Sequence, residues 1–372
     1  MPADAPVIVV GAGPSGLSTA GALARLGIRA IVLERDAEVG ARWAERYDRL
    51  RLHTIKRFSG LAHQPLPRAL PRYVTKDEFA RYLRDYALRF GLDVRLSTEV
   101  TRIRCDADGW IVEAPTAAFR APVVVVATGK YDAPVVPEWP GRETFRGSLV
   151  HSSAYRSGTA YVGQDVLVAG LGNTGAEIAA DLVESGANRV AVSVRTSPPI
   201  TRRDVVGIPI QLLGMAASVL PPRVADRIAS ALQRVAIGDL SRYGLGRAGW
   251  GTFTARRPPV IDVGFLRHLR ARRVEILPAV VRLTEREVVF ADGRSEPFAA
   301  VVAATGFKNA LVDLVDLDAE PARAPPSDAP ARLAHGLYVI GFRETVRGDL
   351  FETRRDSLAL AREISRDLPS PR

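Results

Sequence analysis

The chain has 372 residues and carries 51 lysines and arginines against 41 aspartates and glutamates, which gives a formal net charge of +10. A single cysteine excludes a disulfide framework, a cysteine-based zinc cluster and a redox-active cysteine pair, and five scattered histidines argue against a metal site. The hydrophobic share of 47% and the charged share of 25% are ordinary for a globular protein long enough to fold as two domains.

The start of the chain and its apolar runs favour a cytoplasmic protein. The sequence MPADAPVIVV lacks the basic segment and apolar core of a secretory signal, and no apolar run approaches the roughly 18 residues that span a membrane. The positive charge is almost entirely arginine and is spread along the chain, which argues against nucleic acid and suits anionic small molecules. The oligomeric state stays open, a homodimer included.

The first predicted elements form a βαβ unit. An apolar run at residues 6–10 predicts a buried strand, apolar side chains at helical spacing over 14–26 predict a helix, and 29–33 reads as a second strand. A loop-rich segment follows over 40–70. A capping box at 75–78 then predicts the start of a helix with an apolar face.

A glycine-rich loop lies between the first strand and the first helix. Gly11 allows a tight turn, Gly13 lets a pyrophosphate approach the backbone, and Gly16 lets the helix pack on the strand. Glu34, at the end of the second strand, can accept hydrogen bonds from ribose hydroxyls. The pattern predicts a dinucleotide site for FAD or NAD, against the alternative of a glycine turn that binds nothing.

The same plan then recurs. A hairpin over 99–114 and a buried strand at 122–128 close the first part of the chain. A strand at 165–169, a helix at 176–185 and a strand at 189–194 then repeat the βαβ order.

The second glycine loop carries Gly170, Gly172 and Gly175, and its second strand ends at Arg195 rather than at an acid. An arginine suits the 2′-phosphate of NADPH, although it could also be a solvated surface charge. Two dinucleotide sites in one chain imply that electrons pass between a nicotinamide and a flavin. Because the chain has no cysteine pair, the final acceptor is oxygen, a quinone or a protein.

Residues 201–259 break the alternating pattern, and three interpretations stay open. The segment could be a lid above the active site, or a basic amphipathic helix within it could lie on a membrane. The third interpretation is a packed surface helix. An apolar run at 299–305 then repeats the pattern of the buried strand at 122–128.

A fingerprint between the two loops identifies a family resemblance. The stretch FRGSLVHSSAY contains Phe145, Gly147, His151 and Tyr155, and resembles the FxGxxxHxxx(Y/F) fingerprint of class B flavin-dependent monooxygenases. The family's ATG motifs have counterparts at 127–129 and 304–306. Within the family the chain is most similar to YUCCA-type indole-3-pyruvate monooxygenases, through the stretches YDRLRLH, PVVP, HSSAYRSG, GDLSRYGLG and PVIDVG.

The resemblance implies a fold and two cofactors. It implies an α/β fold of two Rossmann-like domains, with an FAD domain at 1–157 and 305–372 and an inserted NADPH domain at 158–304. NADPH would reduce FAD, oxygen would add at flavin C4a, and the resulting peroxyflavin would transfer one oxygen atom. The implied reaction is oxidative decarboxylation of an aryl α-keto acid, indole-3-pyruvate first. The alternatives are oxygenation of an amine or a sulfide, or NADPH oxidation without oxygenation.

The resemblance also implies roles for individual residues. His53 takes the place of an asparagine that many N-oxygenating members carry near the flavin, and Lys56 keeps the family lysine; together with Asn173 these are the expected catalytic residues. Trp43 is expected to contact a cofactor. His151 is expected to position the connection between the domains, and no metal ligands are expected.

Overall fold

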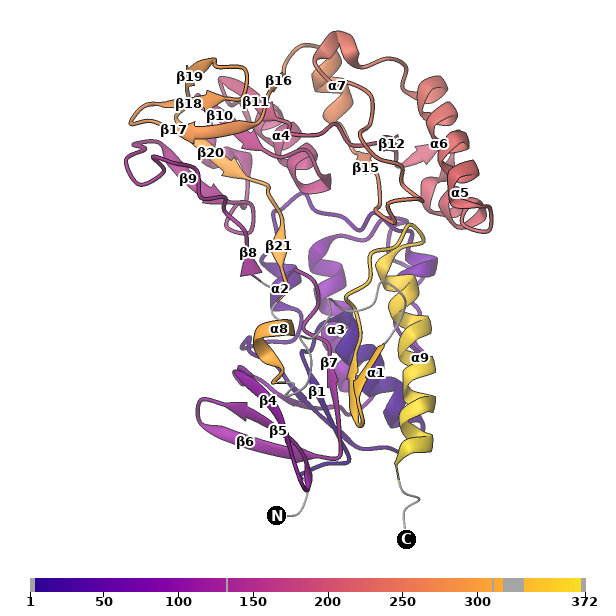
Figure 1. The fold of residues 1–372 in the computed structure, drawn as a ribbon. Helices are drawn as coiled ribbons and strands as arrows, with labels where there is room; N and C mark the ends of the chain where they lie inside the picture. The colour runs from indigo at the N-terminus through magenta and orange to yellow at the C-terminus, as the bar shows by residue number, and fades with distance from the viewer. Residues whose placement is uncertain (1–3, 132, 310, 317–330, 369–372) are drawn as a thin grey trace. The chain divides into compact units, whose positions relative to one another are not determined.

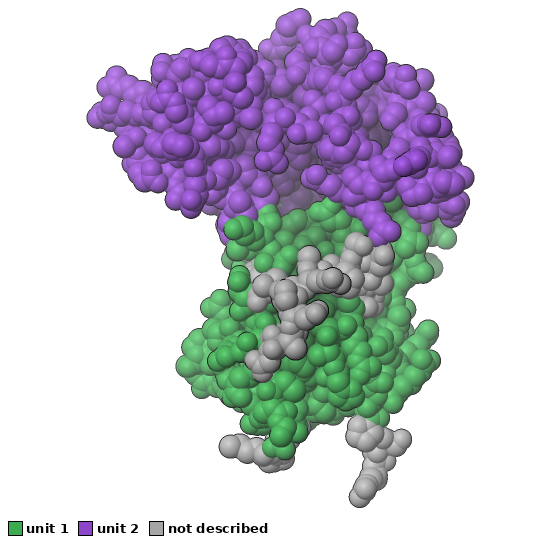
Figure 2. All heavy atoms as spheres, in the orientation of Figure 1, with its two compact units in different colours: residues 1–45, 54–133, 307–372 green, residues 46–53, 134–306 purple. Residues whose placement is uncertain are grey.

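A computed structural model describes residues 4–131, 133–309, 311–316 and 331–368. The described chain divides into two compact units, coloured separately in Figure 2. Unit 1 comprises Met1–Glu45, Thr54–Ala133 and Phe307–Arg372, and unit 2 comprises Arg46–His53 and Pro134–Gly306. This division differs from the expected boundaries at 157/158 and 304/305, since 134–157 and 46–53 make their contacts in unit 2.

Unit 1 is built on a six-stranded sheet with the order β22-β23-β7-β1-β2-β3 (Figure 1). All neighbours pair in parallel except β22 with β23. The central strands are continuous apolar runs because both of their faces are buried. The strands are β1 (Val7–Val10), β2 (Ala30–Leu33), β3 (Asp93–Arg95), β7 (Val123–Val126), β22 (Ala331–Ala334) and β23 (Leu337–Val339).

Helices cover this sheet, and a small antiparallel sheet packs beside it. Helix α1 (Pro14–Arg25) packs on β1 and β2, and both α3 (Lys76–Arg89) and α9 (Asp349–Asp367) pack on α1. The expected hairpin is present and gains a third strand, giving β4 (Arg102–Asp106), β5 (Gly109–Ala114) and β6 (Ala117–Ala121). The expected capping box is also present, since Thr75 accepts from the Glu78 amide at 3.2 Å.

Unit 2 repeats the plan with a five-stranded parallel sheet in the order β16-β11-β10-β20-β9. Helix α4 (Asn173–Ser185) packs on β10 and β11, as α1 does on β1 and β2. The edge strand β9 carries the fingerprint, which explains why 134–157 belongs to this unit. The strands are β9 (Ser148–His151), β10 (Asp165–Ala169), β11 (Arg189–Ser193), β16 (Glu275–Leu277) and β20 (Ala300–Ala303).

The segment that breaks the pattern begins and ends on a pair of parallel strands, β12 (Ile200–Arg202) and β15 (Val260–Asp262). Between them lie β13 (Asp204–Val205), β14 (Ile208–Pro209), helix α5 (Ile210–Ala217), helix α6 (Pro222–Ala236) and the short η3 (Ser241–Tyr243). No helix within the described residues is both long and apolar enough to cross a membrane.

The remaining elements are short. Strands β17 (Val280–Leu283), β18 (Glu287–Phe290) and β19 (Ser295–Pro297) form an antiparallel sheet in unit 2. The others are α2 (Ala41–Ala44), η1 (Lys56–Phe58), β8 (Ala133–Pro134), η2 (Gly158–Tyr161), α7 (Phe265–Arg270), β21 (Phe307–Lys308) and α8 (Leu311–Leu314).

Candidate functional site

Each of the three positions in the first loop is glycine for a different physical reason. Gly11 has φ +103°, and a Cβ there would lie 2.8 Å from the Ala127 carbonyl oxygen. A Cβ at Gly16 would lie 1.8 Å from the Gly11 carbonyl oxygen, which is a severe clash. A Cβ at Gly13 would meet nothing within 4 Å. The loop therefore needs two glycines to fold, whereas the third leaves open space at the N-terminus of α1, as a pyrophosphate cradle requires.

The carboxylate of Glu34 lies beside this loop. Its Oε2 accepts a hydrogen bond from the Ala12 amide at 2.6 Å, and its Oε1 accepts one from the Asp36 amide at 3.0 Å. These bonds fix the acid at the carboxyl end of β2, where it was expected. A dinucleotide on the loop would bring its ribose to this carboxylate.

The second loop has the same construction. Gly170 has φ +110° with a Cβ position 2.6 Å from the Ala304 carbonyl oxygen, and a Cβ at Gly175 would lie 2.0 Å from the Gly170 oxygen. A Cβ at Gly172 would again meet nothing within 4 Å. In both units the alanine of the ATG motif thus closes against the first glycine of the loop. The residues of both loops fit a bound dinucleotide.

The other residues expected around the second loop differ in their surroundings. Arg195 is exposed two residues after the end of strand β11, and within the described chain its side chain has no polar partner. Asn173, the first residue of α4, instead accepts a hydrogen bond from the Ile261 amide at 2.7 Å. This bond holds β15 against the loop, so the structure gives Asn173 a structural contact, and its catalytic role stays a prediction.

The fingerprint residues Phe145, Gly147 and Tyr155 make two separate contacts. The Phe145 ring lies where a Cβ at Gly147 would be, 2.4 Å away, so this position requires glycine. Tyr155 is buried, and its hydroxyl donates to Asp181 at 2.6 Å. Burial, followed by the Asp181 carboxylate, raises the pKa of Tyr155 well above its ordinary value. The fingerprint therefore fixes the path of the chain through β9.

His151 uses both of its ring nitrogens. Nε2 lies 2.9 Å from the Gly306 carbonyl oxygen, which can only accept, so Nε2 carries the proton. Nδ1 accepts from the Ser153 amide at 3.1 Å. Burial lowers the pKa of His151, the Arg46 charge lowers it further, and the bond to Gly306 opposes them. The neutral ring ties β9 to the second ATG motif, and among the described residues no acid or histidine cluster could hold a metal.

Residues 46–53, here called the strap, belong to unit 2 although the chain on either side belongs to unit 1. His53 Nε2 lies 2.9 Å from Oε1 of Glu177, which is 1% exposed; the two are at ion-pair distance without the alignment of a hydrogen bond. The side chain of Tyr47, also in the strap, is buried. Burial and the Glu177 carboxylate raise the pKa of Tyr47. His53 therefore faces a buried carboxylate that the sequence analysis did not single out.

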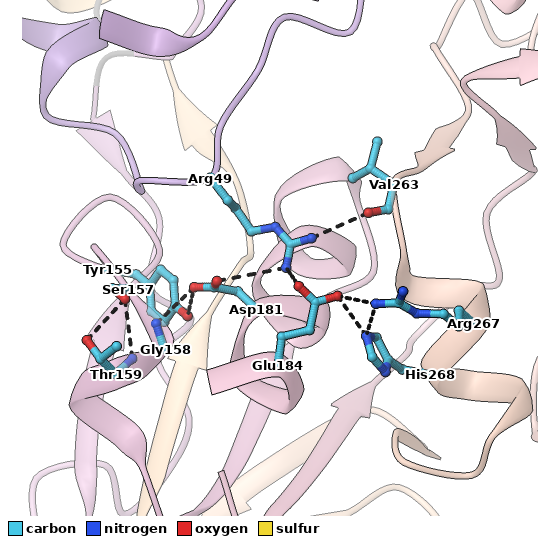
Figure 3. Close-up of polar contacts among 10 residues, drawn as sticks. All are labelled: Arg49, Tyr155, Ser157, Gly158, Thr159, Asp181, Glu184, Val263, Arg267 and His268. Atoms are coloured by element: carbon cyan, nitrogen blue, oxygen red, sulfur yellow. Dashed lines mark hydrogen bonds and ion pairs between the residues drawn. The ribbon is translucent and has the colours of Figure 1, made fainter. Parts of the chain in front are cut away.

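A second cluster forms around Arg49, in the middle of the strap, and is drawn in Figure 3. Arg49 approaches Glu184 at 3.1 Å and Asp181 at 3.8 Å, and Glu184 also accepts from Arg267 at 2.6 Å and His268 at 2.9 Å. Burial raises the pKa of Glu184, but the His268 bond and the neighbouring arginines outweigh burial and lower the pKa below its ordinary value. The cluster fixes the middle of the strap.

An acidic stripe on α4 organises both contacts. Glu177, Asp181 and Glu184 follow one another at spacings of four and three residues, which places them on one face of the helix. This spacing is visible in the sequence and could have indicated a basic or aromatic partner. The partner itself could not have been found from the sequence, because the strap is more than a hundred residues away in the chain.

Two of the expected residues lie in unit 1, with local roles. Lys56 donates to the Arg68 carbonyl at 2.6 Å and to the Leu70 carbonyl, and so closes a surface loop. Trp43 packs edge-on against Phe79 with ring centroids 4.6 Å apart. The structure thus describes Lys56 and Trp43 in one unit and His53 and Asn173 in the other, and it does not group the three expected catalytic residues within one unit.

Known proteins match this chain in sequence over nearly its whole length. Indole-3-pyruvate monooxygenase YUCCA1 of Oryza sativa subsp. japonica is 36% identical, over 96% of this chain and 90% of its own length. Probable indole-3-pyruvate monooxygenase YUCCA1 of Arabidopsis thaliana is 34% identical, over 96% and 89% respectively. The family described as pyridine nucleotide-disulphide oxidoreductase matches residues 8–208.

Solved structures confirm the predicted fold. A flavin-containing monooxygenase from Stenotrophomonas maltophilia aligns with a TM-score of 0.73 at 24% identity, covering 97% of this chain and 98% of that one. OTEMO in complex with FAD and NADP aligns with a TM-score of 0.78 at 17% identity, covering 98% and 85%. With its paired loops, its fingerprint and these matches, the chain belongs to the family of the YUCCA-type indole-3-pyruvate monooxygenases, within the pyridine nucleotide-disulphide oxidoreductases.

Proposed function

We propose that this protein is an FAD- and NADPH-dependent monooxygenase that converts indole-3-pyruvate, or a similar aryl α-keto acid, to the arylacetic acid. The observation that carries the proposal is the pair of glycine loops, each with one glycine facing open space and each closed by an ATG alanine. Two relatives bear the name of this activity at 34% and 36% identity over nearly the full chain. Oxygen and a small organic substrate are the reactants.

The loops divide the two cofactors between the units. We assign FAD to unit 1, on Gly13 and beside Glu34, because a carboxylate accepts from ribose hydroxyls and repels a 2′-phosphate. We assign NADPH to unit 2, on Gly172, because the exposed Arg195 stands at the end of β11, where a 2′-phosphate would lie. The FAD domain then corresponds to unit 1 and the NADPH domain to unit 2.

The balanced reaction consumes the keto acid, NADPH, a proton and O₂, and yields the arylacetic acid, CO₂, NADP⁺ and water. Bound flavin supplies the reductive activation of O₂ that the side chains cannot provide. The protein's part is to bind and orient. His151 holds the second ATG motif in place through the Gly306 carbonyl, and Glu177 faces His53 from α4.

Product analysis tests the proposed reaction. Purified enzyme is incubated with NADPH and ¹⁸O₂ together with indole-3-pyruvate, and separately with trimethylamine and with a thioether. We expect indole-3-acetate that contains one ¹⁸O atom and forms in step with NADPH consumption. An N-oxide or sulfoxide with the keto acid untouched would establish the alternative oxygenation. Stoichiometric hydrogen peroxide with every substrate would identify an NADPH oxidase instead.

A further inference from the structure

Helix α6 turns its apolar face outward. Val224, Ile228, Leu232 and Val235 recur at helical spacing, and their exposed fractions are 41%, 42%, 46% and 88%. An amphipathic helix of a globular protein normally buries such a stripe against the core. Here Ala225 is the only residue of the helix that is fully buried. The stripe therefore lies on the surface of unit 2.

Polar contacts on the other side of α6 hold it in this orientation. Asp226 accepts from the amides of Phe253 and Thr254 at 2.7 and 3.0 Å, and Gln233 accepts from the Ile200 amide at 3.3 Å. Because these contacts fix the polar side inward, the apolar side cannot turn to the core without breaking them. The outward orientation is thus built into the local structure.

The apolar surface continues beyond α6. Helix α5 and the link to α6 expose Leu212, Val219 and Leu220, and the preceding β13–β14 hairpin exposes Val206 and Ile208. Of the fifteen large apolar side chains exposed in the described chain, nine lie between residues 206 and 235. Single exposed apolar side chains are normal, but such a concentration in one segment marks an interaction surface.

The charge of this segment selects the partner. Residues 201–259 contain nine arginines, three aspartates, no lysine and no glutamate, and so carry +6 of the chain's net +10. Arg223, Arg227 and Arg234 are exposed on α6, on one side of the apolar stripe. A second copy of the same surface would bring like charges together, which disfavours self-association. An anionic lipid surface complements both the charge and the apolar stripe.

We infer that the surface formed by α5, the link and the apolar stripe of α6, here called the basic apolar face, lies on anionic membranes. The apolar side chains enter the boundary between headgroups and acyl chains, and the arginines bind the lipid phosphates. The helix lies in the plane of the membrane and does not span it. The inference is independent of the proposed reaction, because it rests on the surface of one segment alone.

Vesicle co-sedimentation of the full-length holoprotein tests the inference. The vesicles are phosphatidylcholine alone and phosphatidylcholine mixed with phosphatidylglycerol, each at low and high salt. We expect binding to the mixed vesicles that weakens with salt, and little binding to phosphatidylcholine. The double variant V224D/V235D should bind at least about tenfold more weakly, because it places charge in the apolar boundary. The triple variant R223Q/R227Q/R234Q should bind about 100-fold more weakly.

Matched variants elsewhere on the surface keep the test specific. L88D places one aspartate, where V224D/V235D places two, at a side chain of α3 that is 80% exposed. R25Q/R81Q/R89Q removes three arginines from exposed positions of unit 1. L88D should leave vesicle binding unchanged. R25Q/R81Q/R89Q should lose only the small part of the vesicle-binding affinity that follows from its lower net charge. Circular dichroism and NADPH oxidation show that each variant is folded.

Three outcomes would overturn the inference. The first is a wild type that binds neither vesicle. The second is a V224D/V235D variant that binds as well as wild type. The third is a wild-type dimer in sedimentation velocity that V224D/V235D converts to a monomer without any vesicle binding, since the face would then be an interface between copies.

Discussion

Gly13 and Gly172 occupy equivalent positions in two loops and give a matched pair of variants. Nothing lies within 4 Å of a Cβ at either position, so a valine is tolerated by the fold but fills the space proposed for a pyrophosphate. We expect Gly13→Val to purify without yellow colour, and Gly172→Val to keep its flavin absorbance while losing NADPH oxidation. A Gly13→Val protein with full flavin content would show that FAD binds elsewhere.

Arg195 should decide the choice between the two nicotinamide coenzymes. A charge-assisted contact to a 2′-phosphate contributes about 1.5–3 kcal/mol, and Arg195 is exposed at the end of β11. Arg195→Ala should therefore raise the Michaelis constant for NADPH by roughly one to two decades and barely change that for NADH. Steady-state kinetics with both coenzymes measure this difference. Equal losses for both would move the role to Arg202 or Arg203.

His151 is expected to act through position rather than chemistry. His151→Ala removes the tie to Gly306, so more NADPH should be diverted to hydrogen peroxide while FAD stays bound. His151→Gln, which can still donate one hydrogen bond, should restore part of the coupling. Peroxide formed per NADPH consumed is the measurement. Full activity that required an added metal would contradict this role.

The pH dependence of His151 has a definite sign. Burial lowers its pKa in the folded chain below the ordinary value of about 6.5, so the unfolded chain binds the proton more tightly. The stability from the neutral ring is complete above that ordinary value and is lost as the pH falls through the folded pKa. The difference in unfolding free energy between wild type and His151→Gln should shrink from pH 7.5 to pH 5. Denaturant titrations across this pH range measure the difference. A difference that stays constant would show that the folded chain does not favour the neutral ring.

At the scale of elements, the strap shows how a short segment without secondary structure can be held firmly. Two of its residues contact the acidic stripe of α4: Arg49 at Glu184 and His53 at Glu177. Because Arg49 and Glu184 are partly buried, removing one of them costs more than removing one partner of an exposed ion pair does.

A double-mutant cycle tests the contact that Arg49 makes from the middle of the strap. Arg49→Ala and Glu184→Gln should each lower stability by about 1–2 kcal/mol, and the double variant should lose clearly less than the sum, because both remove the same contact. Thermal unfolding of the four proteins gives the coupling energy. Arg95→Ala, which removes an exposed pair with Asp93 in unit 1, serves as a control and should cost little. Strictly additive losses would show that Arg49 does not depend on Glu184.

Elements with a local signal were predicted well, and contacts between distant segments were not. Strands β1 and β10, both glycine loops and the capping box at Thr75 follow from patterns within a few residues, and the structure contains them. The contacts of the strap were missed because its partners lie on α4, far along the chain. The apolar face of α6 was visible in the sequence, but periodicity alone does not tell whether a face points to the core or to the solvent.

At the scale of the whole molecule, the chain passes four times between the two units, at residues 45/46, 53/54, 133/134 and 306/307. The family and the α/β fold were predicted correctly because the doubled βαβ plan and the fingerprint extend over most of the sequence. The boundaries differ because β9 pairs with β20, a strand that lies about 150 residues later. Neither unit can therefore be isolated by a single cut.

Because the chain crosses between the units four times, the two units are completed at different times during synthesis. All of unit 2 has been made once residue 306 leaves the ribosome, because the strap was synthesised earlier. Unit 1 must still wait for β23, which pairs with β7, and for α9, which packs on α1. At about 5–20 residues per second the remaining chain takes several seconds. During that interval the first glycine loop stands on an incomplete sheet, so the second nucleotide site is finished before the first.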